Sequence, residues 1–414
     1  MAKQENKTNS FILEFETGLT KKDKDICEKK LRIGRSMYNA FLGEALKRYN
    51  GYQHDERYVT AVKLYRDAKE HKDKDEMKAL GDVMNQIKKD YHWGGKFCLG
   101  DMRKEQSNHF KGALGSMIAV TLSQRAYAAV EKYEKNPEVD RVNFVKYDND
   151  FSIEGCTNDN GIIYKNGLIY FDIRRNEFVS IKPAYKNDDE YYNVALQNRV
   201  KFCRLLSRTI RGKKRYYIQL CLEGNPPLHR NYGNKKIEIL DVKISHAELR
   251  KQGEKPQVIE LAPGCKNPEE RIAAIDRKLE ASRRKSNPDN YNENGTIKKG
   301  QLKWIKSKNY IKLQARKAEI NRAMRERRRV SHETLTNQIL AEGTDITIKH
   351  LSYKEQQQRS KKDTEINPST GMPYSKARQG KNIANRAPAE FIAILNRKLA
   401  YIDKSIIDAS KEGK

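Results

Sequence analysis

The stretch "DITIKHLSYKEQQQRSKK", residues 345–362, runs from a short apolar strand into a basic loop. Ile346 and Ile348 are β-branched and alternate with Thr347 directly after a helical pattern, which is typical of a strand in an α/β sheet. The ends of such strands are where ligands and catalytic groups collect. This strand ends in Lys349 and His350, so the sequence places a cation where a functional group is expected.

The chain is basic along most of its length. Its 414 residues include 83 Lys and Arg against 55 Asp and Glu, a net charge of +28. Such an excess favours a polyanionic partner, and nucleic acid over a membrane surface. No apolar run approaches the roughly 18 residues of a membrane span, and the first ten residues lack the core of a signal peptide. We therefore expect a cytoplasmic protein that binds no membrane.

The cysteines and histidines show no metal-ligand spacing. The six cysteines are scattered and none belongs to a C-x-x-C pair. A structural zinc site needs close pairs of thiolates, because four ligands must converge on one ion. The sequence therefore predicts reduced thiols and no zinc site.

The first half of the chain changes from helical to strand periodicity. Residues 11–17 alternate as a strand, and residues 20–136 then carry the apolar stripes of several helices. From about residue 142 the period is two, with a hairpin turn expected at Asn166-Gly167. We expect a β domain, a small barrel or sheet, formed by residues 1–19 and 137–230 and interrupted by a helical insert, residues 20–136. Further strands are expected at residues 141–147, 199–210 and 214–224.

The second half, residues 231–414, mixes strands and helices. We expect residues 235–245 and 256–262 to form paired strands. A long helix is expected over residues 302–342, with Trp304, Ile311, Ala315 and Ala318 on one apolar stripe. Further elements are expected as a helix over 269–286, a strand over 344–350 and a last helix over 388–402.

Several long motifs resemble the TnpB family of transposon-encoded RNA-guided nucleases, which are related to the type V CRISPR effectors. In the second half they are "SRRKSNPDNYNENGTIKKG" (282–300), "QQRSKK" (357–362) and "NRAPAEFIAILNRKLAY" (385–401). In the first half they are "RIGRSMYNAFLGEALKRYNG" (32–51), "YDNDFSIEGCTNDNGI" (147–162) and "RYYIQLCLEGNPP" (215–227). The resemblance runs in family order from about residue 10 to residue 403, and it implies a bacterial, nucleoid-associated protein.

The resemblance implies an α+β multidomain fold. A wedge-like β-barrel with an inserted helical recognition domain would precede a truncated RNase H-like (RuvC) α/β domain that lacks the zinc ribbon. It also implies two partners, a guide RNA and a double-stranded DNA target that carries a short flanking motif, with one protein bound per guide RNA. Pairing between the guide and the DNA would then supply the sequence specificity.

The same resemblance predicts that the nuclease site is inactive. The family has a metal-binding Glu at the position of Lys349, and a cation there repels Mg²⁺. It has an Asp in the strand "IEILDVKIS", where one register places Leu240 and the next places Asp241. The printed sequence ends soon after Asp403, before the family's zinc ribbon and final Asp. We therefore expect no catalytic residue and no functional Mg²⁺ or Zn²⁺ site, as in nuclease-dead, repressor-type relatives.

Candidate nucleic-acid contacts come from the basic segments and from the insert. A run of charged residues is usually a solvated helix face. Here such runs recur on a long helix, and the family binds its duplex of guide RNA and target DNA along this helix. We therefore expect phosphate contacts from Arg283, Arg284, Lys298, Lys299, Arg316 and Arg322. The insert would read the flanking motif through Tyr58, Asn108 and Ser116. The alternatives are an active or residually active nuclease and a non-functional remnant.

Overall fold

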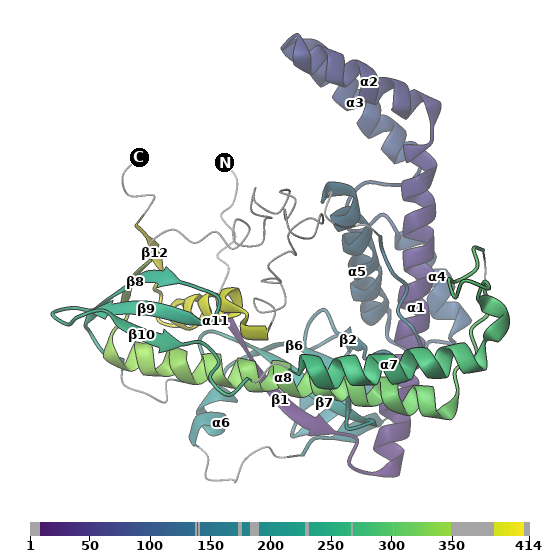
Figure 1. The fold of residues 1–414 in the computed structure, drawn as a ribbon. Coiled ribbons are helices and arrows are strands. Elements are labelled where there is room, and N and C mark those ends of the chain that lie inside the picture. Colours follow the sequence, from purple (N-terminus) through teal and green to yellow (C-terminus); the bar gives the residue numbers. More distant parts are fainter. Residues whose placement is uncertain are drawn as a thin grey trace, which may run out of the picture. The chain divides into compact units, whose positions relative to one another are not determined.

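The computed structural model describes residues 9–136, 139, 141–172, 176–182, 190–227, 232–265, 268–300, 302–348 and 385–409. The chain divides into two compact units, Met1–Pro227 and Leu228–Lys414. Across the described ranges, none of the helices combines the length and the apolar character that crossing a membrane requires. Element labels follow Figure 1.

A four-stranded antiparallel sheet forms the centre of the first unit. Its strands are ordered β1-β7-β6-β2. They span Ser10–Thr17 (β1), Lys213–Glu223 (β7), Val200–Ile210 (β6) and Ser152–Glu154 (β2). Phe11, Leu13 and Phe15 of β1 are buried, as their alternation predicts. The prediction that the first strand joins the later ones is thus confirmed.

A second, smaller sheet contains the predicted hairpin. It is ordered β3-β4-β5 and consists of β3 (Ile163–Lys165), β4 (Leu168–Asp172) and β5 (Glu177–Ser180). Asn166 and Gly167 both have positive φ, +50° and +74°, which a type I′ turn requires. Among the described residues the strands of this unit form two sheets and no closed barrel, so the structure fits the sheet alternative and does not confirm the wedge-like β-barrel.

The strand predicted over residues 141–147 is also absent from the described segment. The side chain of Asn39, on the first helix, takes the place of a strand partner at Val145. Its Nδ2 donates to the Val145 carbonyl at 2.9 Å, and its Oδ1 accepts from the Val145 N–H at 3.0 Å. Because a helix side chain satisfies this backbone, the segment runs as an irregular loop and leaves Phe144 and Tyr147 exposed.

The helices of the first unit are α1 (Lys21–Gln53), α2 (Glu56–Glu70), α3 (Lys74–Asp90), α4 (Gly100–His109), α5 (Ser116–Lys135) and α6 (Glu190–Ala195). A capping box starts α1, in which Thr20 accepts from the Asp23 N–H and Asp23 accepts from the Thr20 N–H. The stripe of Ile33, Met37 and Phe41 is buried, as its spacing predicts. In Figure 1, α2 and α3 lie side by side at the end of α1.

The second unit is built on a five-stranded mixed sheet ordered β10-β9-β8-β11-β12. Its strands are β8 (Lys236–Val242), β9 (His246–Lys251), β10 (Gln257–Glu260), β11 (Asp345–Ile348) and β12 (Ile407–Asp408). The first three are antiparallel, whereas β8, β11 and β12 are parallel. The two strands expected to pair are therefore not neighbours, because β9 lies between β8 and β10. Its polar sequence "HAELRK" gave no strand signal.

Within the described ranges, the helical segments of this unit are α7 (Glu269–Ser286), η1 (Pro288–Asn290), α8 (Lys308–Glu342) and α11 (Pro388–Ala400). The core lies between the sheet and the last third of α8, where Leu335, Ile339 and Leu340 pack with α11. The apolar stripe expected in the first half of α8 is not buried. Trp304 precedes the helix, Ile311 is 54% exposed, and Ala315 and Ala318 are exposed.

Close contact between two backbones fixes the end of α8 beside the sheet. Gly343 follows the helix and forms a bridge with Asn234, directly before β8. A Cβ added at Gly343 would lie 1.9 Å from the Lys235 carbonyl oxygen, so no other residue fits there. This contact sets the start of β11 next to the start of β8, as their parallel register shows.

Candidate nucleic-acid interface

The strand expected to hold the first catalytic Asp contains a β-bulge. Ile239 pairs with Leu249 and Asp241 pairs with Glu248, so Leu240 is the extra residue. Ile239 and Val242 are both buried, and the two residues between them are both partly buried. Regular alternation would place Leu240 and Asp241 on opposite faces of the sheet. The bulge removes that alternation, so the structure favours neither register.

The carboxylates of this strand lie next to cations. Asp241 is 3.8 Å from the Lys243 ammonium and its side chain is 44% exposed. Glu238 forms an ion pair with Arg250, whose Nε donates to it at 3.0 Å. Lys349, at the family's Glu position, lies outside the described residues. Across the ranges that the structure describes, no three His, Cys, Asp or Glu side chains come together as metal ligands.

A short strand that the sequence did not predict runs beside β11. Asp408, which follows the last helix expected from the sequence, lies in β12, opposite Ile348. The only sequence signal is the apolar pair in "SIIDA", which is too short for a strand prediction. The carboxyl ends of β8, β11 and β12 therefore share one edge of the sheet.

The basic candidates of the second unit lie on the helix pair α7–α8 and on the loop between these helices. The two helices pack together, and the Lys317 ammonium forms a 2.6 Å ion pair with Asp276 across their contact. Ser282 and Ser307, at the two ends of the loop, share a hydrogen bond of 2.8 Å. The pair is thus a defined scaffold on which the cations are fixed.

Aromatic rings and one carboxylate hold Arg283 and Arg284 at the end of α7. The Arg283 guanidinium lies over Trp304 at 5.1 Å from the ring centroid, and that of Arg284 lies over Tyr291 at 4.7 Å. Both arginines form ion pairs with Glu280, at 2.5 and 2.9 Å. Cation–π contacts and a shared carboxylate lower their availability for phosphate but fix their orientation.

The other predicted cations differ in how they are paired. Lys298 and Lys299 are exposed on the loop, where the Lys298 N–H donates to the Asn290 carbonyl at 2.9 Å. Arg316 is exposed on α8, and among the described residues it has no ion-pair partner. Arg322 forms an ion pair with Glu319 at 2.7 Å.

Two further exposed arginines of α8 were missed by the sequence analysis. In the run "RAMRERRR", Arg328 pairs with Glu390 and Arg329 pairs with Glu326, both at 2.7 Å. Arg325 and Arg327 are exposed and have no ion-pair partner within the described ranges. The run of arginines in the sequence was the signal, but only the structure separates its paired members from the others.

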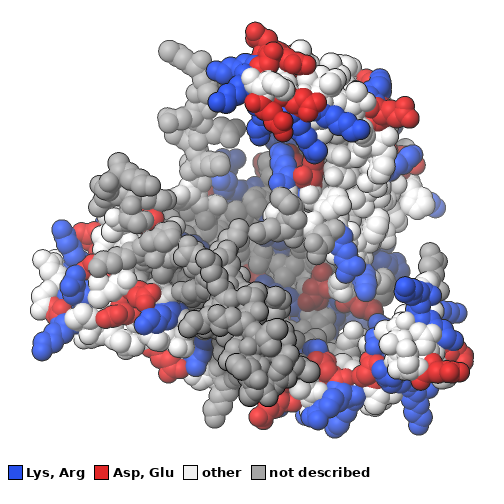
Figure 2. Space-filling view, turned by 45° about the horizontal axis from the view of Figure 1, so that its top comes forward, with Lys and Arg blue, Asp and Glu red and all other residues white. Residues whose placement is uncertain are grey.

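On the face of the molecule shown in Figure 2, acidic and basic side chains are interspersed. Ion pairing therefore decides which cations are available to bind phosphate.

The three candidates in the helical region lie on three different helices, α2, α4 and α5. Tyr58, on α2, belongs to an aromatic cluster, where its ring centroid is 5.0 Å from that of Tyr52 and 5.9 Å from the Lys88 ammonium. Asn108 is exposed near the end of α4, and Ser116 is exposed as the first residue of α5. Among the described residues, no hydrogen bond or ring contact joins any two of the three. The structure therefore gives Tyr58 a packing role.

Comparisons with known proteins give distant structural neighbours. No protein-family model and no curated protein matches the chain. A cryo-EM structure of a Cas12f1–sgRNA–target DNA complex is similar at 9% identity and a TM-score of 0.37, covering 97% of this chain and 89% of that chain. A cryo-EM structure of a CRISPR-Cas12f ternary complex has 11% identity, a TM-score of 0.29, and coverages of 94% and 73%. Both TM-scores are too low for the neighbours' activity to be carried over to this chain.

Proposed function

We propose that this protein is an RNA-guided DNA-binding protein without nuclease activity, which represses transcription by remaining bound at its target. The exposed, unpaired arginines of α8 are the observation that carries the proposal. Arg316, Arg325 and Arg327 are cations that no described carboxylate neutralises, on a helix fixed by its contact with α7. Exposed arginines on a rigid element are suited to the phosphates of a nucleic-acid duplex.

The strand order of the second unit supports the RNase H-like assignment. Three antiparallel strands, β10, β9 and β8, are followed by the parallel strands β11 and β12. This is the order that an RNase H-like sheet has, and the sequence resemblance implies such a domain over residues 231–414. The mixed sheet also brings the "IEILDVKIS" strand next to the strand that opens the motif of residues 345–362.

The described carboxylates of β8 support the absence of a two-metal nuclease centre from this domain. Such a centre needs several carboxylates around each Mg²⁺. Here the sequence has Lys349 where the family has Glu, and Glu238 and Asp241 lie beside Arg250 and Lys243. A metal ion would have to displace these cations from the two carboxylates. The donor set therefore favours binding without hydrolysis.

The test of this function is to identify the nucleic acid that the protein carries. The full chain is purified from its host, and the copurified RNA is sequenced. We expect one enriched RNA whose 3′ segment is complementary to a DNA site beside a short common motif. Reporter expression from that site should fall when the protein and this RNA are both present. Recovery of unrelated RNA fragments, or repression that does not need the RNA, would refute the proposal.

A further inference from the structure

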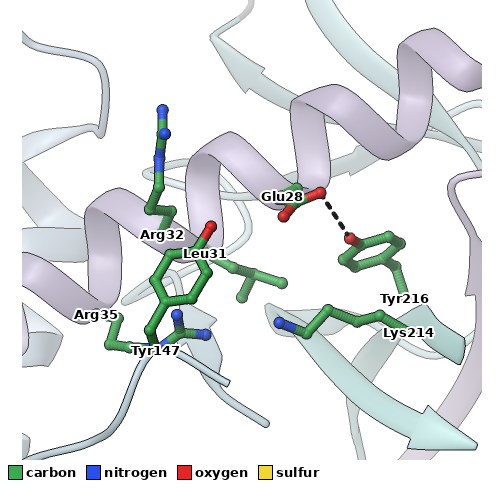
Figure 3. Close-up of a pocket in the computed structure, with 7 residues that line it drawn as sticks. All are labelled: Glu28, Leu31, Arg32, Arg35, Tyr147, Lys214 and Tyr216. Carbon is green, nitrogen blue, oxygen red and sulfur yellow. Dashed lines mark hydrogen bonds between the residues drawn. The ribbon is translucent and has the colours of Figure 1, made fainter. Parts of the chain in front are cut away.

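A small basic pocket lies in the first unit, between α1, the loop that contains Tyr147, and β7 (Figure 3). Its enclosed space is about 10 Å³, enough for one water-sized group. A single oxygen of a phosphate group has this size, while the rest of the phosphate would stay at the surface. The lining residues are Glu28, Leu31, Arg32, Arg35, Tyr147, Lys214 and Tyr216.

Arg35 is a buried cation that forms no ion pair with any described residue. Its side chain is 5% exposed, its Nη2 donates to the Asn149 carbonyl at 3.1 Å, and its Nε has no partner among the described residues. Its guanidinium carbon is 5.5 Å from the centroid of the Tyr147 ring. Burial lowers the pKa of Arg35 from its usual value, although Tyr147, Asp148, Asp150 and Glu28 act in the opposite sense. Burying an unpaired charge costs free energy, so an anion that reaches the guanidinium is stabilised there.

The other charged residues of the pocket add to this attraction. Arg32 is exposed and Lys214 is partly buried, and neither has an ion-pair partner in the described part of the chain. Glu28 is the one acid of the lining, and it accepts a hydrogen bond from the Tyr216 hydroxyl at 3.5 Å. In Figure 3 the ammonium of Lys214 and the guanidinium of Arg35 are directed at the same space, whereas the Arg32 side chain extends from α1 away from it.

An exposed aromatic ring stands beside these cations. Tyr147 is 61% exposed although it lies against Arg35, so most of its ring is open to solvent. An unpaired nucleobase stacks on such a ring, and this stacking depends little on the base. A pocket for one phosphate oxygen, with an exposed tyrosine beside it, matches two neighbouring parts of a single strand, the phosphate and its base.

We propose that this pocket binds one phosphodiester of an unpaired nucleic-acid strand, with the adjoining base stacked on Tyr147. Arg35 and Lys214 hold a phosphate oxygen, and Arg32, an exposed lining residue, adds a further positive charge beside it. The proposal rests on the nucleic-acid binding proposed above and deepens it, because it names a second contact surface in the other unit. The strand is RNA or DNA, and the phosphodiester is the chemistry that the two share.

The test compares short RNA and DNA strands of one sequence, each labelled with fluorescein, by fluorescence anisotropy with the full chain freed of copurified RNA. Arg35 stays intact because it is part of the packed interior. Lys214→Gln and Arg32→Gln each remove one charge from the pocket, and Lys47→Gln removes one exposed charge from α1 outside it. We expect each pocket variant to bind about tenfold more weakly and to lower the log–log salt slope by about 0.7, with no change for Lys47→Gln.

Tyrosine variants separate stacking from charge. Tyr147→Leu should weaken single-strand binding about tenfold without changing the salt slope, and Tyr147→Phe should bind as the natural chain does.

A loss of binding confined to the RNA strand assigns the pocket to the guide, and a loss confined to the DNA strand assigns it to the target. Both outcomes support the proposal. If the pocket variants match Lys47→Gln while the Arg316, Arg325 and Arg327 variants lose binding, the pocket is refuted and the proposed function stands. If the natural chain binds neither strand, both are refuted.

Discussion

The two halves of α8 have opposite surroundings. In the half that ends at Glu342, Leu335, Ile339 and Leu340 are buried against the sheet and α11. In the half that begins at Lys308, Ile311 is 54% exposed, and Arg316 is exposed without an ion-pair partner among the described residues. One continuous helix thus carries a core face at one end and a cationic face at the other. Substitutions of the exposed arginines before residue 330 should affect binding, and substitutions in the buried segment from Leu335 onward should affect stability.

The largest effect is expected from the buried half. Leu340→Ala removes a side chain that is 1% exposed in the core of the second unit. The lost burial and the cavity should lower the free energy of unfolding by about 2–5 kcal/mol. Urea denaturation followed by circular dichroism measures this loss. A loss below about 1 kcal/mol would contradict the core role of this half.

The next largest effect is expected on nucleic-acid affinity. A triple variant with Arg316, Arg325 and Arg327 changed to Gln removes three unpaired cations and leaves the core intact. Each lost phosphate contact lowers the log–log salt slope by about 0.9, so binding to duplex DNA should fall by about two orders of magnitude at low salt. The affinity is measured by gel shift at several salt concentrations.

Arg329→Gln is the matched control for the triple variant, because Arg329 is paired with Glu326 on the same helix. Its salt slope should be close to that of the natural chain. If Arg329→Gln loses as much slope as one of the unpaired arginines, pairing does not decide which cations contact phosphate, and our assignment of the binding face fails.

A smaller, pH-dependent effect is expected where α8 meets α11. Glu333 pairs with Lys398 at 2.6 Å and also with Arg397. Burial acts to raise the pKa of Glu333, but the hydrogen bonds and charges of Lys398 and Arg397 outweigh it, so the pKa is lowered. A lowered pKa stabilises the fold above the unfolded value of about 4.3, and this stabilisation is lost as the pH falls through the folded value.

Glu333→Gln should therefore lower the free energy of unfolding by about 1–3 kcal/mol at neutral pH. The difference from the natural chain should shrink as the pH falls from about 5 to about 3, where Glu333 becomes protonated in both states. Urea midpoints at several pH values measure it. A difference that stays constant over this range would mean that the Glu333 charge does not stabilise the fold.

The smallest effect is expected in the exposed half. Ile311→Ala removes about the same volume as Leu340→Ala, but from a side chain that is more than half exposed. Its effect on the free energy of unfolding should stay within about 0.5 kcal/mol. A larger loss would show that this half of α8 is buried in solution, as the apolar stripe in the sequence had suggested.

Turns and buried helix faces, which depend on residues close together in the sequence, were predicted from local sequence patterns. The Asn166-Gly167 turn and the buried stripe of α1 follow from residues within one element, and both are confirmed. The strand expected over residues 141–147 was wrong because Asn39, about a hundred residues earlier in the chain, satisfies its backbone. A long-range hydrogen bond of this kind has no sequence signal.

The candidate nucleic-acid interface likewise depends on contacts between residues that are far apart in the sequence. The basic run in α8 is visible in the sequence, but its division into paired and unpaired arginines depends on Glu390 of another helix. The bulge at Leu240 comes from the pairing of β8 with β9, which the polar sequence of β9 concealed. The pocket around Arg35 joins residues from three separate segments, so no local motif could reveal it.

Guide-directed binding without cleavage is measured in one assay with two gels. The target-pairing segment of the guide RNA is first replaced by a new sequence. The full chain is then combined with this guide RNA and with a labelled DNA duplex that matches the new segment. On a native gel the matched duplex should shift and a mismatched one should not. On a denaturing gel the strands should remain full-length with Mg²⁺, as they do with EDTA. Shorter strands that appear with Mg²⁺ alone, or a shift that ignores the guide, would contradict this account.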